Sequence, residues 1–155
     1  MRRKDREVTD REVIIAIIHS ADVCRISFAD NNIPYIVTMN FGFKDGEKDE
    51  LYFHSAPEGR KLEMLRKNNY VCFEMDTGHK LYRGKKGCDW GMNFRSVVGY
   101  GRIYIVEEEE EKKKGLDQIM DQYGGKRPYN YDSKILNKTT ILRLDILEMT
   151  AKIKN

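Results

Sequence analysis

Residues 23–43, VCRISFADNNIPYIVTMNFGF, carry the clearest structural pattern of the chain. β-Branched and aromatic residues fill two runs, 23–28 and 33–43, and residues 29–32 (ADNN) between them form a turn cluster. This pattern predicts two antiparallel strands joined as a hairpin. A polar loop around Gly46 follows, and the run 51–55 (LYFHS) predicts a further strand.

The rest of the chain continues as short strands and helices. Strands are predicted at residues 70–75, 96–106 and 139–147, and helices at 9–19, 57–67 and 107–123. Thr9 and Glu12 fit a capping box for the first helix, and Pro57 suits the first turn of the second. Residues 76–94 have no periodicity, several glycines and the only tryptophan, so we expect a long loop near the functional site.

About six short strands with three helices, joined mainly as hairpins, predict a mainly β (α+β) fold. Because long open sheet edges invite aggregation, we expect an antiparallel sheet closed or nearly closed on itself, a small β-barrel with peripheral helices. No repeat, low-complexity tract or linker divides the chain. Residues 1–155 are therefore expected to form a single domain.

Composition argues against several classes of protein. The chain has 155 residues and a formal net charge of +3, too small and too interspersed for a dedicated DNA-binding face. No run approaches the roughly 20 apolar residues of a membrane span, and the N-terminus is charged rather than an apolar signal core. We expect a cytoplasmic protein with no membrane or nucleic-acid partner. The three cysteines are widely spaced and are expected to be reduced thiols.

The segment 52–61 places a strand end, a hydroxyl, a glycine and two adjacent cations at the mouth of a helix. Ser55, Arg60, Lys61 and the free N–H groups of the helix start could together bind a phosphate monoester, which carries about two negative charges. Cations in the first turn of a helix oppose the helix dipole, and a bound anion would cancel that cost. The alternative is that Arg60 and Lys61 are two solvated surface cations.

Several motifs together resemble a known family. They are Pro34-Tyr35-Ile36-Val37, Tyr52-Phe53-His54-Ser55 with Gly59-Arg60-Lys61, Cys88-Asp89-Trp90, Arg95-Ser96-Val97 and Gly101. In this order, and over nearly the whole chain, the sequence is similar to the nitroimidazole-resistance branch of the pyridoxamine 5′-phosphate oxidase-like flavoproteins. The resemblance implies an FMN-binding split β-barrel that acts as a homodimer, with one flavin in each of two clefts at the subunit interface.

The resemblance also implies which residues bind the cofactor. The phosphate-binding cations fall on Arg60 and Lys61, and Arg95-Ser96-Val97 occupies the place where related oxidases have a polar residue that reaches the flavin. The strands that line the flavin fall on Val37, Thr38, Met39 and Asn40 and on Phe53, His54 and Ser55. Thr38 stands where the branch usually has proline, which restores a backbone donor, and Gly59 stands where the oxidases have serine.

His54 is the expected catalytic residue, since the resemblance places the branch's characteristic histidine there and an imidazole can donate a proton during reduction. The alternative is a hydrogen-bonded histidine at a strand end. Trp90 is expected either to cover the cofactor or substrate from the partner subunit or to anchor loop packing. Cys72, His79 and Cys88 are too irregularly spaced for a zinc site, so no metal is expected, and Cys72 is expected in the core.

The resemblance favours an FMN-dependent oxidoreductase. Its substrate would be a small aromatic or nitro compound, reduced with electrons from a reduced nicotinamide cofactor, NAD(P)H. The sequence has no pyridoxal-phosphate signature, so pyridoxamine oxidation is not the expected activity. A second hypothesis is a non-catalytic flavin- or haem-binding module for storage or sensing.

Two further possibilities concern other surfaces. A nucleic-acid-binding barrel could use Tyr35, Tyr52 and Tyr82 as a stacking surface, although the modest net charge argues against it. The basic cluster at residues 2–4 is expected to be a frayed tail, and the alternative is a contact with the flavin phosphate of a partner subunit.

Overall fold

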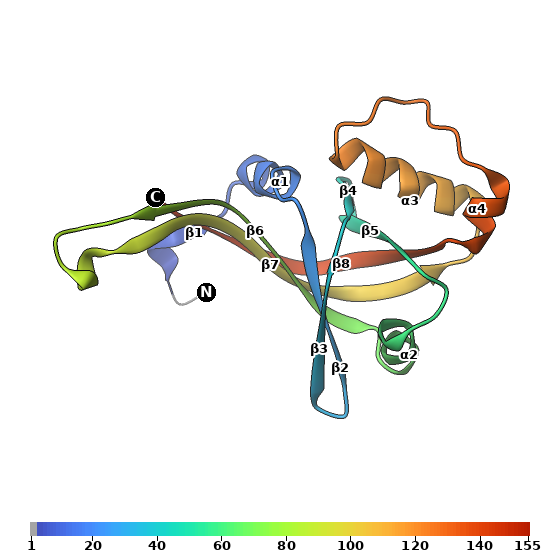
Figure 1. The fold of residues 1–155 in the computed structure, drawn as a ribbon, viewed down its shortest axis with the longest axis horizontal. Helices are drawn as coiled ribbons and strands as arrows, with labels where there is room; N and C mark the ends of the chain where they lie inside the picture. Colours follow the sequence, from blue (N-terminus) through green and yellow to red (C-terminus); the bar gives the residue numbers. More distant parts are fainter. Residues whose placement is uncertain (1–2) are drawn as a thin grey trace.

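The computed structural model describes residues 3–155, which form one curved antiparallel sheet with helices around it (Figure 1). The strands are β1 Glu7–Val8, β2 Cys24–Asp30, β3 Ile33–Met39, β4 Gly42–Lys44, β5 Glu50–Ser55, β6 Tyr70–Tyr82, β7 Gly91–Val106 and β8 Thr140–Lys154. The helices are α1 Arg11–His19, α2 Arg60–Lys67, α3 Glu109–Gln122 and α4 Ser133–Lys138, with short 3-10 turns η1 Lys4–Arg6 and η2 Gly87–Asp89. The sheet order is β3-β2-β6-β7-β8-β5-β4, and β1 pairs with β8.

The sheet is not closed. Its end strands, β3 and β4, do not pair with each other, so the fold is a split barrel. The prediction of a mainly antiparallel sheet with peripheral helices is confirmed, but the predicted numbers are too low: residues 3–155 contain eight strands and four α-helices. The elements that the prediction missed are short: β1 has two residues, β4 has three and α4 has six.

The hairpin predicted from residues 23–43 is confirmed as far as Met39. β2 and β3 pair along their whole length. The turn residues Asn31 and Asn32 have φ values of 49° and 61°, the left-handed conformation that a tight hairpin turn requires and asparagine tolerates.

The prediction of one continuous strand to residue 43 is wrong. The chain leaves the sheet after Met39 and returns as β4, which pairs with β5 instead of β2. Phe41 between the two strands is buried, and its backbone N–H donates to the hydroxyl oxygen of Tyr123 at 3.2 Å. The break therefore depends on a residue 82 positions away in the sequence.

The prediction of a long loop at residues 76–94 is also wrong. β6 runs on to Tyr82 and β7 begins at Gly91, so only residues 83–90 connect them. Residues 78–94 form an arm that projects from one end of the molecule (Figure 1). Because neither face of the arm packs on the core, its residues need not alternate between apolar and polar. β8 runs on past its predicted end at residue 147 because its last residues pair with β7 beside the arm.

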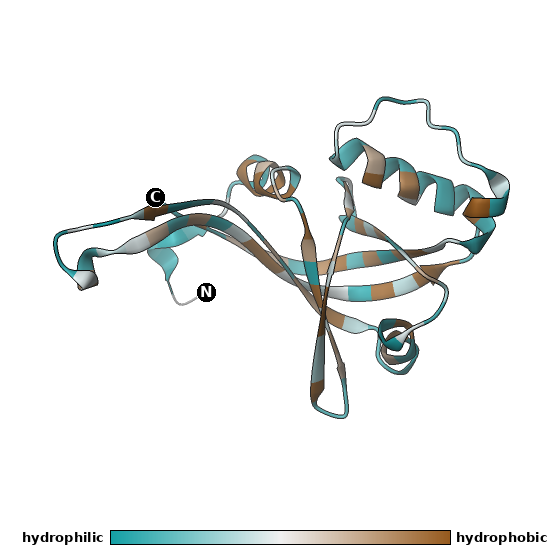
Figure 2. Ribbon diagram, in the orientation of Figure 1, coloured by the Kyte–Doolittle hydropathy of each residue, from teal (hydrophilic) through white to brown (hydrophobic). Residues whose placement is uncertain are grey.

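The main core is built from alternate residues of the strands and closed by α1 and α2. Its largest fully buried side chains are those of Phe28, Phe41, Phe53 and Phe73. Burial of each contributes about 1.5–3 kcal/mol to stability. Figure 2 shows apolar colours on α1 and the central strands and hydrophilic colours at the turn of the arm.

The cysteines divide between the two faces of the sheet. Cys24 is fully buried in the core. The prediction that Cys72 is a core residue is wrong, because strand alternation places it on the face opposite its buried neighbours Val71 and Phe73. Cys88 is exposed in the turn of the arm.

Helix starts differ from prediction in their capping residues. Asp10, and not Thr9, caps α1, and its Oδ1 accepts a hydrogen bond from the Glu12 N–H at 2.9 Å. α2 begins at Arg60, because Gly59 with φ of 128° takes the N-cap position. Pro57 lies before that helix. α3 falls within two residues of its predicted bounds.

A smaller apolar cluster holds α3 against the sheet. It contains Tyr52, Val106, Ile119 and Ile141. Tyr52 is 3% exposed, so the expectation that it belongs to a nucleic-acid stacking surface is wrong. The Tyr52 hydroxyl donates to the Glu50 carboxylate at 3.1 Å, and burial raises the pKa of Tyr52.

The basic cluster at residues 2–4 is described only in part. Arg2 lies outside the described residues. The Arg3 guanidinium donates to the Asp5 carboxylate at 2.7 Å, and Lys4 begins η1. Within residues 3–155, no helix combines the length and the apolar character needed to cross a membrane.

Candidate functional site

The ends of β3 and β5 meet the start of α2 around a hollow of about 200 Å³. We refer to it as the β3–α2 hollow. It is lined by Val37, Thr38, Met39, Asn40, His54 and Lys61. Each of these residues belongs to the set predicted to contact a flavin, and the fold brings them together from three elements.

Strand alternation decides which residues of β5 face this hollow. His54 is exposed and lines it. Phe53 is fully buried in the core instead. Ser55 is 8% exposed, and its hydroxyl donates to the carbonyl oxygen of Ala56 at 2.8 Å. Of these three predicted residues, only His54 lines the hollow.

The two predicted phosphate-binding cations diverge at the start of α2. Lys61 is half-buried and lines the β3–α2 hollow. The Arg60 guanidinium carbon lies 4.7 Å from the centre of the Tyr35 ring, which is a cation–π contact. Arg60 lines a neighbouring hollow of about 360 Å³ together with Asp30 and Glu63. The structure therefore places Lys61, but not Arg60, in the β3–α2 hollow.

Gly59 gives α2 an open N-terminus. Its φ of 128° lies in a region that favours glycine, and a Cβ built there would meet no atom within 4 Å. Backbone conformation, and not crowding, therefore requires glycine at this position. Its carbonyl oxygen accepts from the N–H groups of Leu62 and Glu63, so the N–H groups of Arg60 and Lys61 precede the helical hydrogen bonds.

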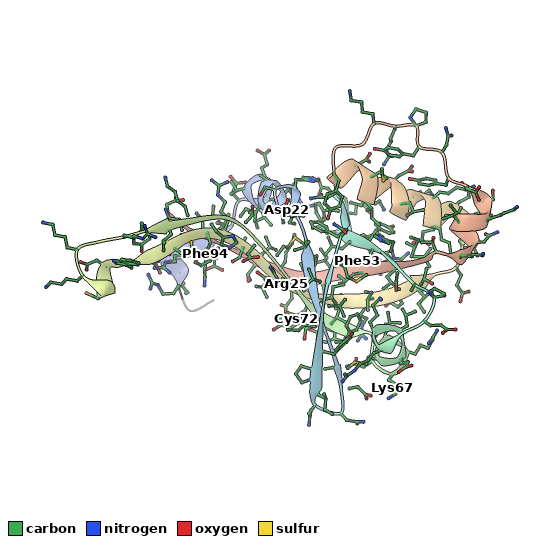
Figure 3. The ribbon with its side chains drawn as sticks, in the orientation of Figure 1. Asp22, Arg25, Phe53, Lys67, Cys72 and Phe94 are labelled. Atoms are coloured by element: carbon green, nitrogen blue, oxygen red, sulfur yellow. The ribbon has the colours of Figure 1, made fainter. Side chains whose placement is uncertain are left out.

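The remaining predicted site residues lie on or beside the arm. Trp90 is 51% exposed, and its Nε1 donates to the carbonyl oxygen of Gly84 at 3.1 Å. Arg95 and Ser96 pair with Thr77 and Asp76 of β6. Figure 3 labels Phe94, next to Arg95, well apart from Phe53 in the body of the sheet. One protomer therefore does not bring these residues to the β3–α2 hollow.

An ion-pair group braces the base of the arm. Arg25 of β2 donates to Glu74 at 3.0 Å and to Asp76 at 2.6 Å, and His79 lies 2.8 Å from the other Asp76 oxygen. Burial acts to raise the pKa of Asp76, but Arg25 and His79 outweigh it and lower that pKa. Within residues 3–155, no group of three or more His, Cys, Asp or Glu side chains could hold a metal ion.

Sequence reasoning missed a second hollow beside His54. This groove of about 410 Å³ lies between α3, α4 and the end of β5. It depends on α4, which the prediction did not include. A signal for that helix is present, since Asp132 caps it by accepting from the N–H groups of Lys134 and Ile135 at 2.7 and 3.2 Å.

With this geometry in place, comparison with known proteins identifies the family. The sequence profile described as pyridoxamine 5′-phosphate oxidase matches residues 10–153. The chain belongs to the pyridoxamine 5′-phosphate oxidase family. The match spans both the β3–α2 hollow and the arm, and it confirms the resemblance seen in the sequence motifs.

Solved structures of the family's fold agree with this assignment. A protein of Bacteroides thetaiotaomicron, provisionally named a 5-nitroimidazole antibiotic resistance protein, is 36% identical; the match covers 95% of this chain and 86% of that one, with a TM-score of 0.82. The flavocytochrome Anf3 of Azotobacter vinelandii (21% identity, 100% and 72% coverage, TM-score 0.81) shares the fold. The FAD and heme binding protein of Mycobacterium smegmatis also shares the fold: it is 17% identical, the match covers 97% of this chain and 74% of that one, and the TM-score is 0.82. No curated protein matches the chain.

Proposed function

We propose that this chain binds FMN in the β3–α2 hollow and uses it to reduce a small aromatic or nitro compound with electrons from NAD(P)H. The observation that carries the proposal is the meeting of Lys61, the open start of α2 and the end of β3 in one hollow. The name of the Bacteroides relative supports a nitroimidazole-type substrate, and the names of two structural neighbours support a flavin.

The hollow suits the chemically different ends of FMN. The Lys61 ammonium and the first N–H groups of α2 suit a phosphate group. β3 is an edge strand that pairs only with β2, so its outward backbone groups are available to a polar ring edge. Thr38 retains the backbone N–H that a proline would lack. Val37 and Met39 add apolar contacts to the same wall.

His54 is the proposed proton donor. Bound FMN would supply the hydride and electron transfer chemistry. Reduction of a nitro group to a nitroso group consumes two electrons and two protons and releases water. A hydride from NAD(P)H carries both electrons and one proton, so a second proton is required. His54 is exposed in the hollow, and an imidazole can donate that proton to a bound substrate.

We propose a homodimer because the hollow on one protomer is small for the cofactor. Its volume of about 200 Å³ lies below the ~300–1,000 Å³ that is typical of small-molecule sites. A second copy would provide the missing wall. In this arrangement Trp90, Arg95 and Ser96, which lie on or beside the arm, contact the flavin of the partner subunit.

The outer face of the sheet is suited to this contact. Ile36, Ser27, Cys72 and Tyr100 form a row across neighbouring strands β3, β2, β6 and β7. Ile36 is 64% exposed and Tyr100 is 40% exposed. Exposed apolar residues gathered on one sheet face are typical of an interaction surface, and we assign this surface to a second copy of the chain.

The test of cofactor binding is the absorption spectrum of the purified protein before and after denaturation. The denatured protein is then removed by filtration. Flavin absorption in the filtrate supports a non-covalent site, and chromatography distinguishes FMN from FAD. A protein that is colourless and stays so after incubation with FMN contradicts the proposal. If the protein is yellow but NAD(P)H does not bleach it, or nitroaromatic compounds do not reoxidise it once reduced, a storage or sensing module is favoured.

The role of His54 is tested by His54→Gln. This variant should retain FMN but reduce a nitroaromatic compound about 10²–10⁴-fold more slowly, the usual contribution of a general acid. His19→Gln is the matched control, because His19 ends α1, contacts Gln122 at 3.1 Å and lines neither hollow. Equal rates for wild type and His54→Gln would show that His54 is not the proton donor.

A further inference from the structure

His54 separates two hollows, and only one of them is assigned above. The second is the groove of about 410 Å³ between α3 and α4. This volume lies within the ~300–1,000 Å³ of small-molecule sites. A ligand in the groove and a flavin in the β3–α2 hollow would therefore both be neighbours of the same imidazole.

Five of the ten residues that line the groove are apolar, and apolar atoms supply most of its exposed surface. α3 contributes Leu116, Ile119 and Met120, and α4 contributes Ile135 and Leu136. The polar groups are those of His54, Asn130, Tyr131, Asp132 and Thr139. The Tyr131 hydroxyl donates to Asp117 at 2.7 Å and the Thr139 hydroxyl donates to the Ile135 carbonyl at 2.9 Å, so both are already engaged.

The charge of the groove restricts its ligand. Asp132 is its one ionisable carboxylate among the described lining residues, and these include no lysine or arginine. An anionic ligand would meet the Asp132 carboxylate and no lysine or arginine, which disfavours phosphates and carboxylates. A dinucleotide such as NAD(P)H, with its pyrophosphate, is therefore a poor occupant. An uncharged ring is compatible with the apolar walls.

Close packing against the sheet holds α3, which forms one wall of the groove. A Cβ on Gly115 of α3 would lie 2.7 Å from the Tyr52 ring and 2.9 Å from the Ile141 side chain. Arg143 of β8 also donates to the Glu111 carboxylate of α3. α3 is thus fixed on the sheet at its first turns and its middle, which favours a preformed site.

We infer that this groove binds the electron acceptor, an uncharged aromatic compound whose polar substituent faces His54. That the bound compound accepts electrons rests on the proposed function. Its binding in the groove can be tested separately. It also assigns a role to α4, since Ile135 is 67% exposed and lies in the groove wall.

The test uses two probes of similar size and different charge, 4-nitrotoluene and 4-nitrobenzoate, in equilibrium dialysis against the FMN-incubated protein. Wild type should bind 4-nitrotoluene at least about tenfold more tightly than 4-nitrobenzoate. Ile135→Lys should weaken 4-nitrotoluene binding at least about tenfold and should strengthen 4-nitrobenzoate binding, because it places a cation in the wall. Asn137→Lys is the control, since it adds the same charge on exposed α4 outside the groove.

The outcomes separate the two proposals. If the protein binds FMN but Ile135→Lys and Asn137→Lys have the same affinity for both probes, the groove assignment is wrong and the proposed function stands. If the protein binds no FMN but the probes respond to Ile135→Lys as expected, the groove is an aromatic site and the proposed function is wrong. Loss of FMN in Ile135→Lys would also overturn the inference, because it would place the flavin in the groove.

Discussion

Replacement of Lys61 by alanine should weaken FMN binding by removing one charged donor to the phosphate. A hydrogen bond to a charged group contributes about 1.5–3 kcal/mol, and each 1.4 kcal/mol corresponds to a factor of ten. The expected loss is therefore about 10- to 150-fold in affinity. Arg60→Ala should cost less, because the Arg60 guanidinium lies over Tyr35 and lines the neighbouring hollow. The double variant should release FMN and stay folded.

The assay is the quenching of flavin fluorescence on titration with protein, carried out with both FMN and riboflavin. Riboflavin lacks the phosphate, so Lys61→Ala should leave its affinity unchanged. Lys67→Ala is the matched control, because Lys67 lies in the last turn of the same helix and pairs with Asp30 at 2.6 Å. If Lys61→Ala lowers the affinities for FMN and riboflavin equally, or lowers neither, Lys61 does not bind the phosphate.

Three further predictions concern stability and accessibility. Gly42→Ala should lower the free energy of unfolding by about 1–3 kcal/mol, because the new Cβ would lie 2.3 Å from the Gln118 backbone; urea denaturation measures this, with Gly46→Ala, whose nearest atom is at 3.5 Å, as control. Because the pKa of Asp76 is lowered in the folded state, the unfolded chain takes up that proton first as pH falls, so stability should drop from the ordinary carboxyl pKa of about 3.9 downward. Asp76→Asn should lose less stability between pH 6 and pH 3, and an equal loss would refute this. In thiol labelling Cys88 should react first and Cys24 only after unfolding, since burial raises the pKa of the Cys24 thiol. Labelling of Cys72 should slow as protein concentration increases and the proposed dimer forms.

Local signals predicted the elements that depend on neighbouring residues. The Asn31-Asn32 turn is one, since both residues tolerate positive φ and the flanking runs are β-branched. α3 is another, because its acidic first turn and the glycines after it set its limits within two residues. The adjacent cations Arg60 and Lys61 at a helix start were also visible in the sequence, and their binding of an anion stays a prediction.

Other features could not be predicted, because they depend on contacts between distant residues. The arm has no hydrophobic alternation, since neither of its faces packs on the core. The break after Met39 is held by Tyr123, from the far end of α3. The divergence of Arg60 and Lys61 depends on the Tyr35 ring, which β3 places beneath one of the two side chains.

Local patterns alone predicted an antiparallel, mainly β chain, two adjacent cations at a helix start and a histidine at the end of a strand. Turn conformation, capping and periodicity act over a few residues, so they can be recognised without coordinates. Coordinates were needed to show that the sheet stays open, that Phe53 and Ser55 turn away from the hollow, and that His54 lies between two hollows. These facts follow from strand order and from the packing of α3 and α4, which join residues that no local pattern connects.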